Sequence, residues 1–364
     1  MGRYAERSPR TPRTTCPRAR SSTGITCKGL DDVMASIFVY ESLSAGAAAG
    51  PEGPDCELLA AGLAMRDAIV DDLARLDGVA VTCAVGAAPG PEAASHGGST
   101  RLATAAARAG ESAEAFVGRM AAAHDLCWIV APETGGELAR LHAVVGEERW
   151  IGCDAASIRC ASSKRASLAV LAAAGVPTAL DGAASHHGRW IVKPDDGAGC
   201  LSTRVYRDHG AALAAVAVDP AHVDTLALQP FVEGEALSIS MIVGADLATA
   251  VSYNRQRIDI DPAGRLCDLG VLAGALDAAT DFRIPRLDAI AAATARALPG
   301  LGGFVGMDVV WNDERGAVVI EVNPRVTCAY VGLSSKLGRN LAADILRLKA
   351  VGAPTRGRRD GVRA

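Results

Sequence analysis

Three oxygen-bearing side chains in the C-terminal third of the chain have the types and spacing of a metal site. Glu321 and Asn323 stand two residues apart in the apolar run AVVIEVN, so both side chains leave the same face of a strand. The preceding run FVGMDVVW carries one acid, Asp308, and a turn at 312–316 would bring it close to Glu321. Hard oxygen ligands of this kind suit Mg²⁺ or Mn²⁺ shared with nucleotide phosphates. The alternative is an ordinary hairpin with one solvated face, but three metal-type residues followed by Arg325 favour the metal site.

A lysine followed by a glycine-rich turn supplies a second chemical signal. Lys193 ends the apolar run WIV and directly precedes the turn PDDGAGC. Gly197 and Gly199 free the backbone to close over an anion, and the lysine ammonium is a compact positive charge for phosphate. The spacing does not match GxxxxGK[ST], so this is not a Walker P-loop. Because the same pattern occurs at ordinary strand exits, phosphate binding and a purely structural turn stay equally open.

The elements expected around these residues fall into two units. The first alternates short apolar strands with amphipathic helices, which is typical of an open α/β unit with a parallel sheet. Its expected elements are a strand at 36–41, a helix at 57–76, a strand at 79–85, a helix at 113–123 and a strand beginning at Leu126. The second unit mixes helices with antiparallel strands and is therefore α+β. Its expected elements are a helix at 162–174, strands at 189–194, 225–232, 238–244 and 248–254, a helix at 286–298 and the hairpin of the metal-type residues.

These patterns predict domain boundaries. The segments are a first domain at 34–160, a second at 161–350, an N-terminal stretch at 1–33 and a basic tail at 351–364. The N-terminal stretch sets arginines among Ser, Thr and Pro without apolar periodicity. It is either disordered or an over-extension of a chain whose translation begins at Met34.

The overall composition limits the classes of partner that this protein is expected to bind. A net charge of -4 and a pI near 6.0 give no general attraction to nucleic acid or anionic membranes. No apolar run reaches the roughly 18 residues that a membrane span needs. The ten cysteines are scattered without a CxxC pair, which indicates reduced thiols in a cytoplasmic protein. We therefore expect small-molecule partners, and the sequence leaves a homodimer open.

Four strings in one order carry a family resemblance. KPDDGAG after an apolar strand, LQPFVEG one strand later, then GMDVVW and IEVNPR resemble the ATP-grasp superfamily over about residues 161–349. The resemblance implies an N-terminal open α/β pre-ATP-grasp domain followed by a two-subdomain ATP-grasp fold, with subdomains 161–230 and 231–350, that holds ATP between its subdomains. It implies phosphate contacts from two lysines, an adenine contact from the backbone around Gln229 to Val232, and a metal site. The residues so implied are Lys164 and Lys193 for phosphate, Gln229, Phe231 and Val232 for adenine, and Asp308, Glu321 and Asn323 for Mg²⁺ or Mn²⁺.

Two positions depart from better-known ATP-grasp members. Gly306 stands where D-alanine ligase-like enzymes have an arginine, and Ala236 stands where many members have a glutamate. Nearby charged residues could replace them. The candidates are Arg325 and Arg255 for the reacting groups, and Glu235 or Glu233 for the ribose.

Shorter strings narrow the resemblance further. IFVYESLSAG, SYNRQRI and NPRVTCAYVGL are similar to the tyramine–L-glutamate ligases of methanofuran biosynthesis. This similarity implies that the acid is the γ-carboxyl of glutamate and the amine is tyramine or a tyrosine-like compound. Arg255 and Arg257 would then orient a carboxylate or acyl phosphate by bidentate contacts, although a solvated strand end explains them equally well.

The combined prediction is an ATP-dependent carbon–nitrogen ligase that forms an amide through an acyl phosphate. Phosphoryl transfer needs positioning and charge neutralisation rather than a covalent protein nucleophile, which agrees with the residues present. The competing hypotheses are a kinase-like phosphotransferase and a non-catalytic nucleotide-binding regulator. The presence of Lys193, Asp308 and Glu321 argues against the regulator.

Overall fold

The computed structural model describes residues 35–46, 56–86, 101–197, 199–218, 225–245 and 247–352. The N-terminal stretch 1–33 lies outside these ranges, as does the basic tail except for 351 and 352. Within them no helix combines the length and apolar character that crossing a bilayer requires. The cysteines that they contain are free thiols.

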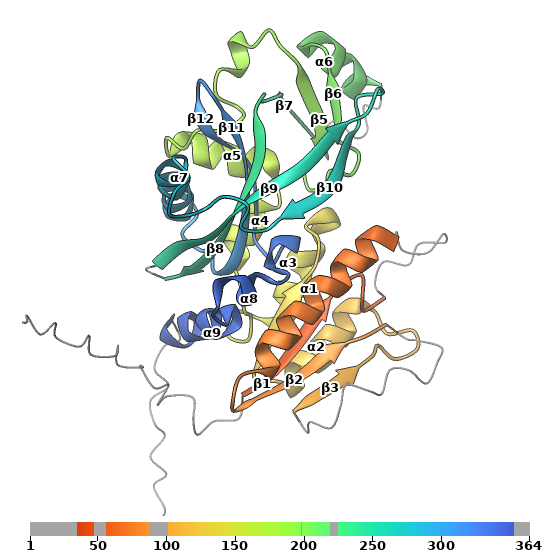
Figure 1. Cartoon of the computed structure of the whole chain (residues 1–364). Coiled ribbons are helices and arrows are strands. Elements are labelled where there is room, and N and C mark those ends of the chain that lie inside the picture. The colour runs from red at the N-terminus through yellow and green to blue at the C-terminus, as the bar shows by residue number, and fades with distance from the viewer. Residues whose placement is uncertain are drawn as a thin grey trace, which may run out of the picture.

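The described residues of the first domain form a four-stranded parallel sheet with the order β3-β2-β1-β4 (Figure 1). Its strands are β1 (Ala35–Glu41), β2 (Val79–Ala84), β3 (Leu102–Ala105) and β4 (Leu126–Val130). Its helices are α1 (Cys56–Ala74), α2 (Ala113–Ala123), α3 (Glu137–Val145) and α4 (Ala155–Ala161). Alternate residues of β1 face opposite sides: Ile37 packs with the apolar residues of α1, and Phe38 packs with those of α2 and α3. The predicted open α/β unit is confirmed.

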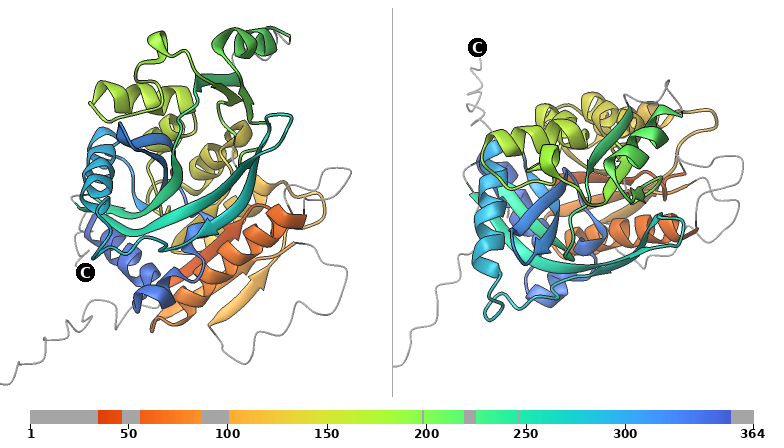
Figure 2. Two further views of the ribbon diagram at one scale, coloured as in Figure 1. Left: turned by 45° about the horizontal axis from the view of Figure 1, so that its top comes forward. Right: turned by 90° about the horizontal axis from the view of Figure 1, so that it is seen from above.

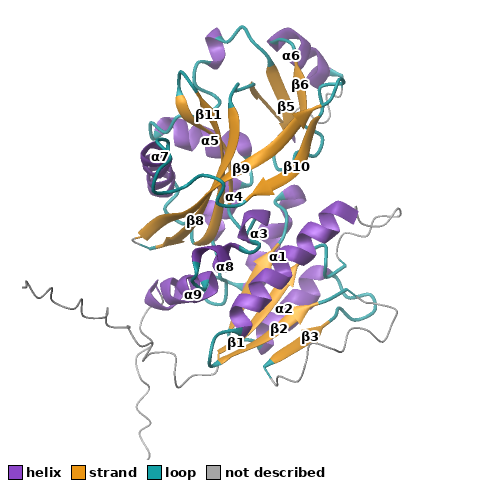
Figure 3. Ribbon diagram, in the orientation of Figure 1, coloured by secondary structure: helices purple, strands orange, loops and turns teal. Residues whose placement is uncertain are grey.

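The rest of the chain forms two antiparallel sheets, distinguished from the helices in Figure 3. The smaller has the order β6-β5-β7, from β5 (Trp190–Pro194), β6 (Arg204–Tyr206) and β7 (Leu226–Pro230). The larger has the order β10-β9-β8-β11-β12, from β8 (Glu235–Gly244), β9 (Leu247–Ile260), β10 (Leu266–Leu272), β11 (Gly303–Asn312) and β12 (Gly316–Asn323). The predicted hairpin turn between Asn312 and Gly316 is confirmed. The predicted α+β character is confirmed as well.

Five helices of the described residues accompany the two antiparallel sheets. α6 (His209–Ala217) packs on the smaller sheet. α5 (Lys164–Ala173), α7 (Ile284–Ala297) and α9 (Leu341–Gly352) pack on the larger sheet, and the short α8 (Leu333–Leu337) precedes α9. Short 3₁₀ turns are η2 (Thr134–Gly136), η3 (Ala183–Ser185) and η5 (Cys328–Tyr330). In the left view of Figure 2, α6 lies at the outer end of the molecule, far from α1. The smaller sheet therefore projects away from the first domain.

The first domain and the larger sheet share one apolar core. The aromatic ring of Tyr330 packs edge-on against Trp128 of β4 and Phe304 of β11. The carboxylate of Asp72 in α1 is buried beside it and accepts hydrogen bonds from the Tyr330 hydroxyl at 2.8 Å and from Ser334. These contacts fix α1 to the chain that follows β12.

Candidate nucleotide and metal site

A cavity of about 350 Å³ lies between the two antiparallel sheets. β5 and β7 line one side of it, and β8, β9, β11 and β12 line the other. Much of the wall is apolar, with a small group of convergent charged and amide side chains, which is the usual composition of a small-molecule site. The apolar lining residues include Ile191, Val232, Ile258, Val310 and Ile320, and the polar ones are Lys164, Lys193, Thr203, Gln229, Gln256, Asp308 and Glu321.

The strand register gives the cavity two distinct ends. At one end of β5, Lys193 pairs with Ala227 of β7. At the other end, the N–H of Phe231 bonds to the carbonyl of Arg189 at 2.9 Å. Lys193 lies four positions after Arg189, which is about 13 Å along a strand. The lysine end and the Phe231 end are therefore far enough apart for an elongated ligand to contact both.

The metal-type residues of the hairpin meet as the sequence predicted. Asp308 of β11 lies directly opposite Glu321 of β12 in the ladder, and a β-bulge follows between residues 308 and 309. Asn323 leaves the same face and its amide lies 3.4 Å from the second carboxylate oxygen of Asp308. The Gln256 amide on β9 donates to the other oxygen at 3.0 Å. Two carboxylates and two amides thus surround one point.

Burial sets the protonation behaviour of the two acids. Removal from water, followed by the neighbouring Glu321 charge, raises the pKa of Asp308 to about 8. Burial acts in the same direction on Glu321, but the positive charges of Lys164 and Lys193 outweigh it and keep the pKa of Glu321 below its ordinary value. The lysine nitrogens lie 3.5 and 3.8 Å from one Glu321 oxygen. Glu321 is accordingly the ionised member of the pair.

The donor set fits a hard divalent cation. Among the residues that the structure describes, no group of three or more His, Cys, Asp and Glu side chains could hold a metal by itself. Two carboxylates with an amide are nevertheless what Mg²⁺ takes from a protein when phosphate oxygens and water complete its shell. Amide oxygen and nitrogen are interchangeable in such assignments, so Asn323 can present its oxygen.

Two of the chain's five lysines line the cavity. Lys193 is only 4% exposed, and burial, with the nearby charge of Lys164, lowers its pKa against the attraction of Glu321. Lys164 is the first residue of α5, behind the N-cap Ser163, and its ammonium donates to the carbonyl of Gly197. It therefore holds the glycine-rich turn as well as facing Glu321.

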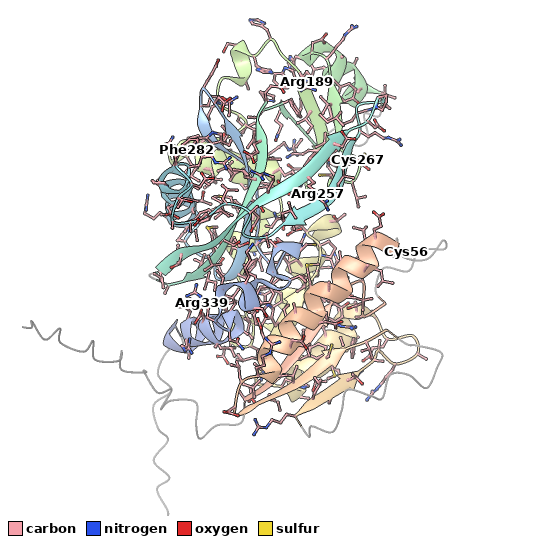
Figure 4. All side chains as sticks on the ribbon, in the orientation of Figure 1. Cys56, Arg189, Arg257, Cys267, Phe282 and Arg339 are labelled. Carbon is pink, nitrogen blue, oxygen red and sulfur yellow. The ribbon has the colours of Figure 1, made fainter. Side chains whose placement is uncertain are left out.

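The crossover from β7 to β8 forms the opposite end of the cavity. Phe231 and Val232, for which the family resemblance implies an adenine contact, line this end. Behind them, the Arg189 guanidinium lies 4.3 Å from the centre of the Phe231 ring and pairs with Glu233 at 2.7 Å (Figure 4 labels Arg189). Gly234 has φ 145°, and a Cβ there would lie 2.1 Å from the Trp311 carbonyl oxygen. Arg189 thus contacts both Phe231 and Glu233 and holds the segment between β7 and β8 in place.

Two predicted residues lie elsewhere. Gln256 and Ile258 of β9 face the cavity, so Arg255 between Gln256 and Asn254 leaves the opposite face. Its Nε lies 2.5 Å from Glu235, which also pairs with Arg283 next to α7. Arg255 and Glu235 therefore pair with each other, and neither lines the cavity. Arg257, labelled on β9 in Figure 4, lies two residues from Arg255 and therefore leaves the same face of β9, the face opposite the cavity.

Arg325 does not line the cavity either. It is largely buried and forms two 2.9 Å bonds with the carboxylate of Glu133, just after β4 of the first domain. Gly306 pairs with Asn323 in the ladder, and a Cβ there would lie 2.6 Å from the Thr327 methyl, so the position has no room for a larger side chain such as arginine. Sequence reasoning missed Gln256 and Glu133. Alternation along SYNRQRI puts Gln256 and Ile258 on one face, but it does not say which face meets the cavity, and nothing local pointed to Glu133.

Comparisons with known proteins agree with this architecture. One family model, the pre ATP-grasp 3 domain, matches residues 80–158, and a second, the ATP-grasp domain, matches residues 161–329. The chain belongs to the ATP-grasp superfamily.

Curated relatives match a part of the chain. A tyramine–L-glutamate ligase of Methanocaldococcus fervens is 36% identical over 109 residues, which are 30% of this chain and 33% of that protein. Its counterpart in Methanocaldococcus jannaschii is 33% identical over 108 residues, 30% of this chain and 32% of that protein. The match therefore spans about a third of the length of these relatives.

Solved structures share the fold over most of the chain. A protein of the ATP-grasp superfamily from Archaeoglobus fulgidus has a TM-score of 0.59 at 21% identity, covering 86% of this chain and 88% of its own. The VanG D-Ala:D-Ser ligase of Enterococcus faecalis has a TM-score of 0.60 at 13% identity, covering 86% and 99%. An L-amino acid ligase of Bacillus licheniformis has a TM-score of 0.57 at 14% identity, covering 86% and 73%. At these identities the likeness concerns the fold.

Proposed function

We propose that this protein is an ATP-dependent carbon–nitrogen ligase that joins a carboxylate to an amine and releases ADP and phosphate. The observation that carries the proposal is the meeting of two lysines, two acids and two amides at one end of an elongated cavity, Lys164, Lys193, Asp308, Glu321, Asn323 and Gln256. Fold and family agree with it, and the two curated relatives above are named as ligases.

The two ends of the cavity suggest how ATP lies. The adenine packs among the apolar residues next to Phe231 and Val232, and the phosphates extend toward Lys193 and the glycine-rich turn at Gly197 and Gly199. Asp308, Glu321 and Asn323 would hold Mg²⁺ or Mn²⁺, which neutralises phosphate charge when bound. Lys193, the glycine-rich turn and the three metal-type residues would together position the terminal phosphate and exclude water from it.

The chemistry then needs no covalent protein nucleophile. An oxygen of the substrate carboxylate attacks the terminal phosphorus, and the bond from that phosphorus to the bridging oxygen breaks, releasing ADP. The amine nitrogen attacks the acyl carbon of the resulting acyl phosphate, inorganic phosphate leaves, and the nitrogen loses a proton. The lysine ammonium groups stabilise the charge that develops on the transferring phosphoryl oxygens.

The substrates we propose are the γ-carboxyl of glutamate and tyramine or a tyrosine-like amine. The support is the likeness to the two tyramine–L-glutamate ligases, which is limited to about a third of their length. With these substrates the protein would act in methanofuran biosynthesis.

The test is ADP release with each pairing of amino acids and amines, together with detection of the product by mass spectrometry. We expect glutamate plus tyramine to give equal amounts of ADP and amide. Glutamate labelled with ¹⁸O in its γ-carboxyl should transfer one label per turnover to the released phosphate. ADP formed with a phosphorylated product and no amide would favour a phosphotransferase, and no stimulation by any acid and amine would end the ligase proposal.

A further inference from the structure

A four-residue turn of the first domain contacts both halves of the candidate site. This turn, residues 133–136, follows β4 by two residues. At its start, Glu133 is 5% exposed and forms two 2.9 Å bonds with the guanidinium of Arg325. Arg325 follows β12 by one residue and so stands two residues beyond the metal-type Asn323. The turn is thereby attached to the exit of the metal strand.

The same turn binds the phosphate end of the cavity. The N–H of Gly135 donates to the carboxylate of Asp196 at 2.8 Å, and the Thr134 hydroxyl donates to the Asp196 carbonyl at 3.1 Å. Asp196 belongs to the glycine-rich turn and immediately precedes Gly197, whose carbonyl accepts from Lys164. Two contacts therefore connect the first domain to the segment that lines the cavity after Lys193.

The conformation of the turn is specific. Gly135 and Gly136 both have positive φ, 62° and 72°, which side chains other than glycine rarely adopt. Nothing lies within 4 Å of a Cβ built on Gly135, so conformation rather than space calls for glycine there. The Arg140 guanidinium of α3 donates to the Gly135 carbonyl. The adjacent helix thus supports the turn that directs the Gly135 N–H toward Asp196.

We propose that the turn 133–136 is a positioning element of the active site, with Glu133 and Asp196 as its positioning residues. It fixes the phosphate-side turn through Asp196 and the exit of the metal strand through Arg325, so the first domain sets the separation of these two parts. This inference rests on the proposed ATP-dependent function.

Charge and geometry predict opposite effects at Asp196, which makes it the sharpest position to test. Its carboxylate is a negative charge near the expected phosphates, so by charge alone its loss would tighten ATP binding. Loss of the contact between its carboxylate and the Gly135 N–H would weaken binding instead, while the Thr134 contact to its backbone carbonyl remains. Asp196→Ala removes both the charge and the acceptor, whereas Asp196→Asn removes the charge but keeps an oxygen that accepts from Gly135.

The experiment measures the Kd of ATP with Mg²⁺ and the KM and kcat of both variants and the wild type. We expect Asp196→Ala to bind ATP about tenfold more weakly and Asp196→Asn to stay within about twofold of wild type. The matched control is Asp277→Ala, which removes a carboxylate that accepts from Ala279 and Thr280 in a loop that does not line the cavity. It should leave both constants unchanged. Equal or tighter binding by Asp196→Ala would overturn the inference.

A second variant tests the other end of the turn. Glu133→Gln keeps the side-chain shape but removes the anion that holds Arg325. We expect kcat to fall about tenfold while the KM of ATP stays within about twofold, opposite to the pattern at Asp196. An unchanged kcat in a folded Glu133→Gln protein would overturn this half, and the Asp196 pair decides the inference if that protein does not fold. Failure of the wild type itself to bind ATP would instead overturn the proposed function.

Discussion

Lys193 offers the most quantitative test of the cavity. Its ammonium is 4% exposed, lies 3.8 Å from Glu321 and stands at the end of the cavity assigned to phosphate. A charge pair at about 4 Å with an effective dielectric constant of about 20 is worth about 4 kcal/mol. Measured losses of hydrogen bonds to charged groups are about 1.5–3 kcal/mol. We therefore expect Lys193→Met to weaken ATP binding by about 2–3 kcal/mol, or about 30- to 150-fold.

The fold should survive this change. Methionine fills much of the lysine volume, and Glu321 retains Lys164 at 3.5 Å as an ionic partner. Titration calorimetry with ATP and Mg²⁺ gives the affinity, and thermal unfolding checks the fold. Lys349→Met is the matched control, because Lys349 is also partly buried, with burial lowering its pKa, but its ammonium contacts the Glu147 carbonyl far from the cavity. ATP affinity within threefold of wild type in a folded Lys193→Met protein would refute the reasoning.

Three further changes test packing and the crossover. Gly306→Ala should lower the free energy of unfolding by about 1–3 kcal/mol through its collision with the Thr327 methyl, and adding Thr327→Ser should restore most of it in chemical denaturation; no recovery would contradict this packing. Asp72→Ala should cost about 2–3 kcal/mol in the same assay because the buried Tyr330 hydroxyl loses its acceptor, and a loss below about 0.5 kcal/mol would count against that contact. Arg189→Ala should raise the KM of ATP about threefold with kcat unchanged. Arg189→Lys should recover only part of the ATP affinity, because lysine cannot form the bidentate pair with Glu233. A wild-type KM in Arg189→Lys would argue against a role for this pair.

The sequence predicted the metal-type hairpin because its geometry is local. Side chains two residues apart share a strand face, and the turn between Asn312 and Gly316 sets which residues lie opposite each other. Asp308 and Glu321 therefore met as expected. Lys193 was found from its place before a glycine-rich turn and Lys164 from the family resemblance, and the structure brings both to Glu321. The β-bulge after Asp308 left no readable signal in the sequence.

The placement of Arg255, Glu235 and Arg325 depends on strand face and on distant ion-pair partners, and none of the three lines the cavity. The run SYNRQRI alternates, but its sequence does not say which face meets the cavity, and that choice placed Gln256 inside and Arg255 outside. Glu235, which was considered with Glu233 for the ribose, pairs with Arg283, 48 residues away in the chain. Glu133 lies 192 residues from Arg325, and no local pattern reports a pair at that separation. The helices and strands, which follow from local periodicity, were correspondingly easier to predict than these ion pairs.

The central claim is that Glu321 holds the metal that ATP-dependent turnover requires. Its most direct test is ADP release by Glu321→Gln against wild type across a Mg²⁺ titration, with thermal unfolding as the check on the fold. Since even outer-shell partners of metal ligands cost about 10- to 100-fold when changed, we predict a loss of at least about 100-fold in turnover that added Mg²⁺ does not restore. Wild-type turnover by a folded Glu321→Gln protein would contradict the account.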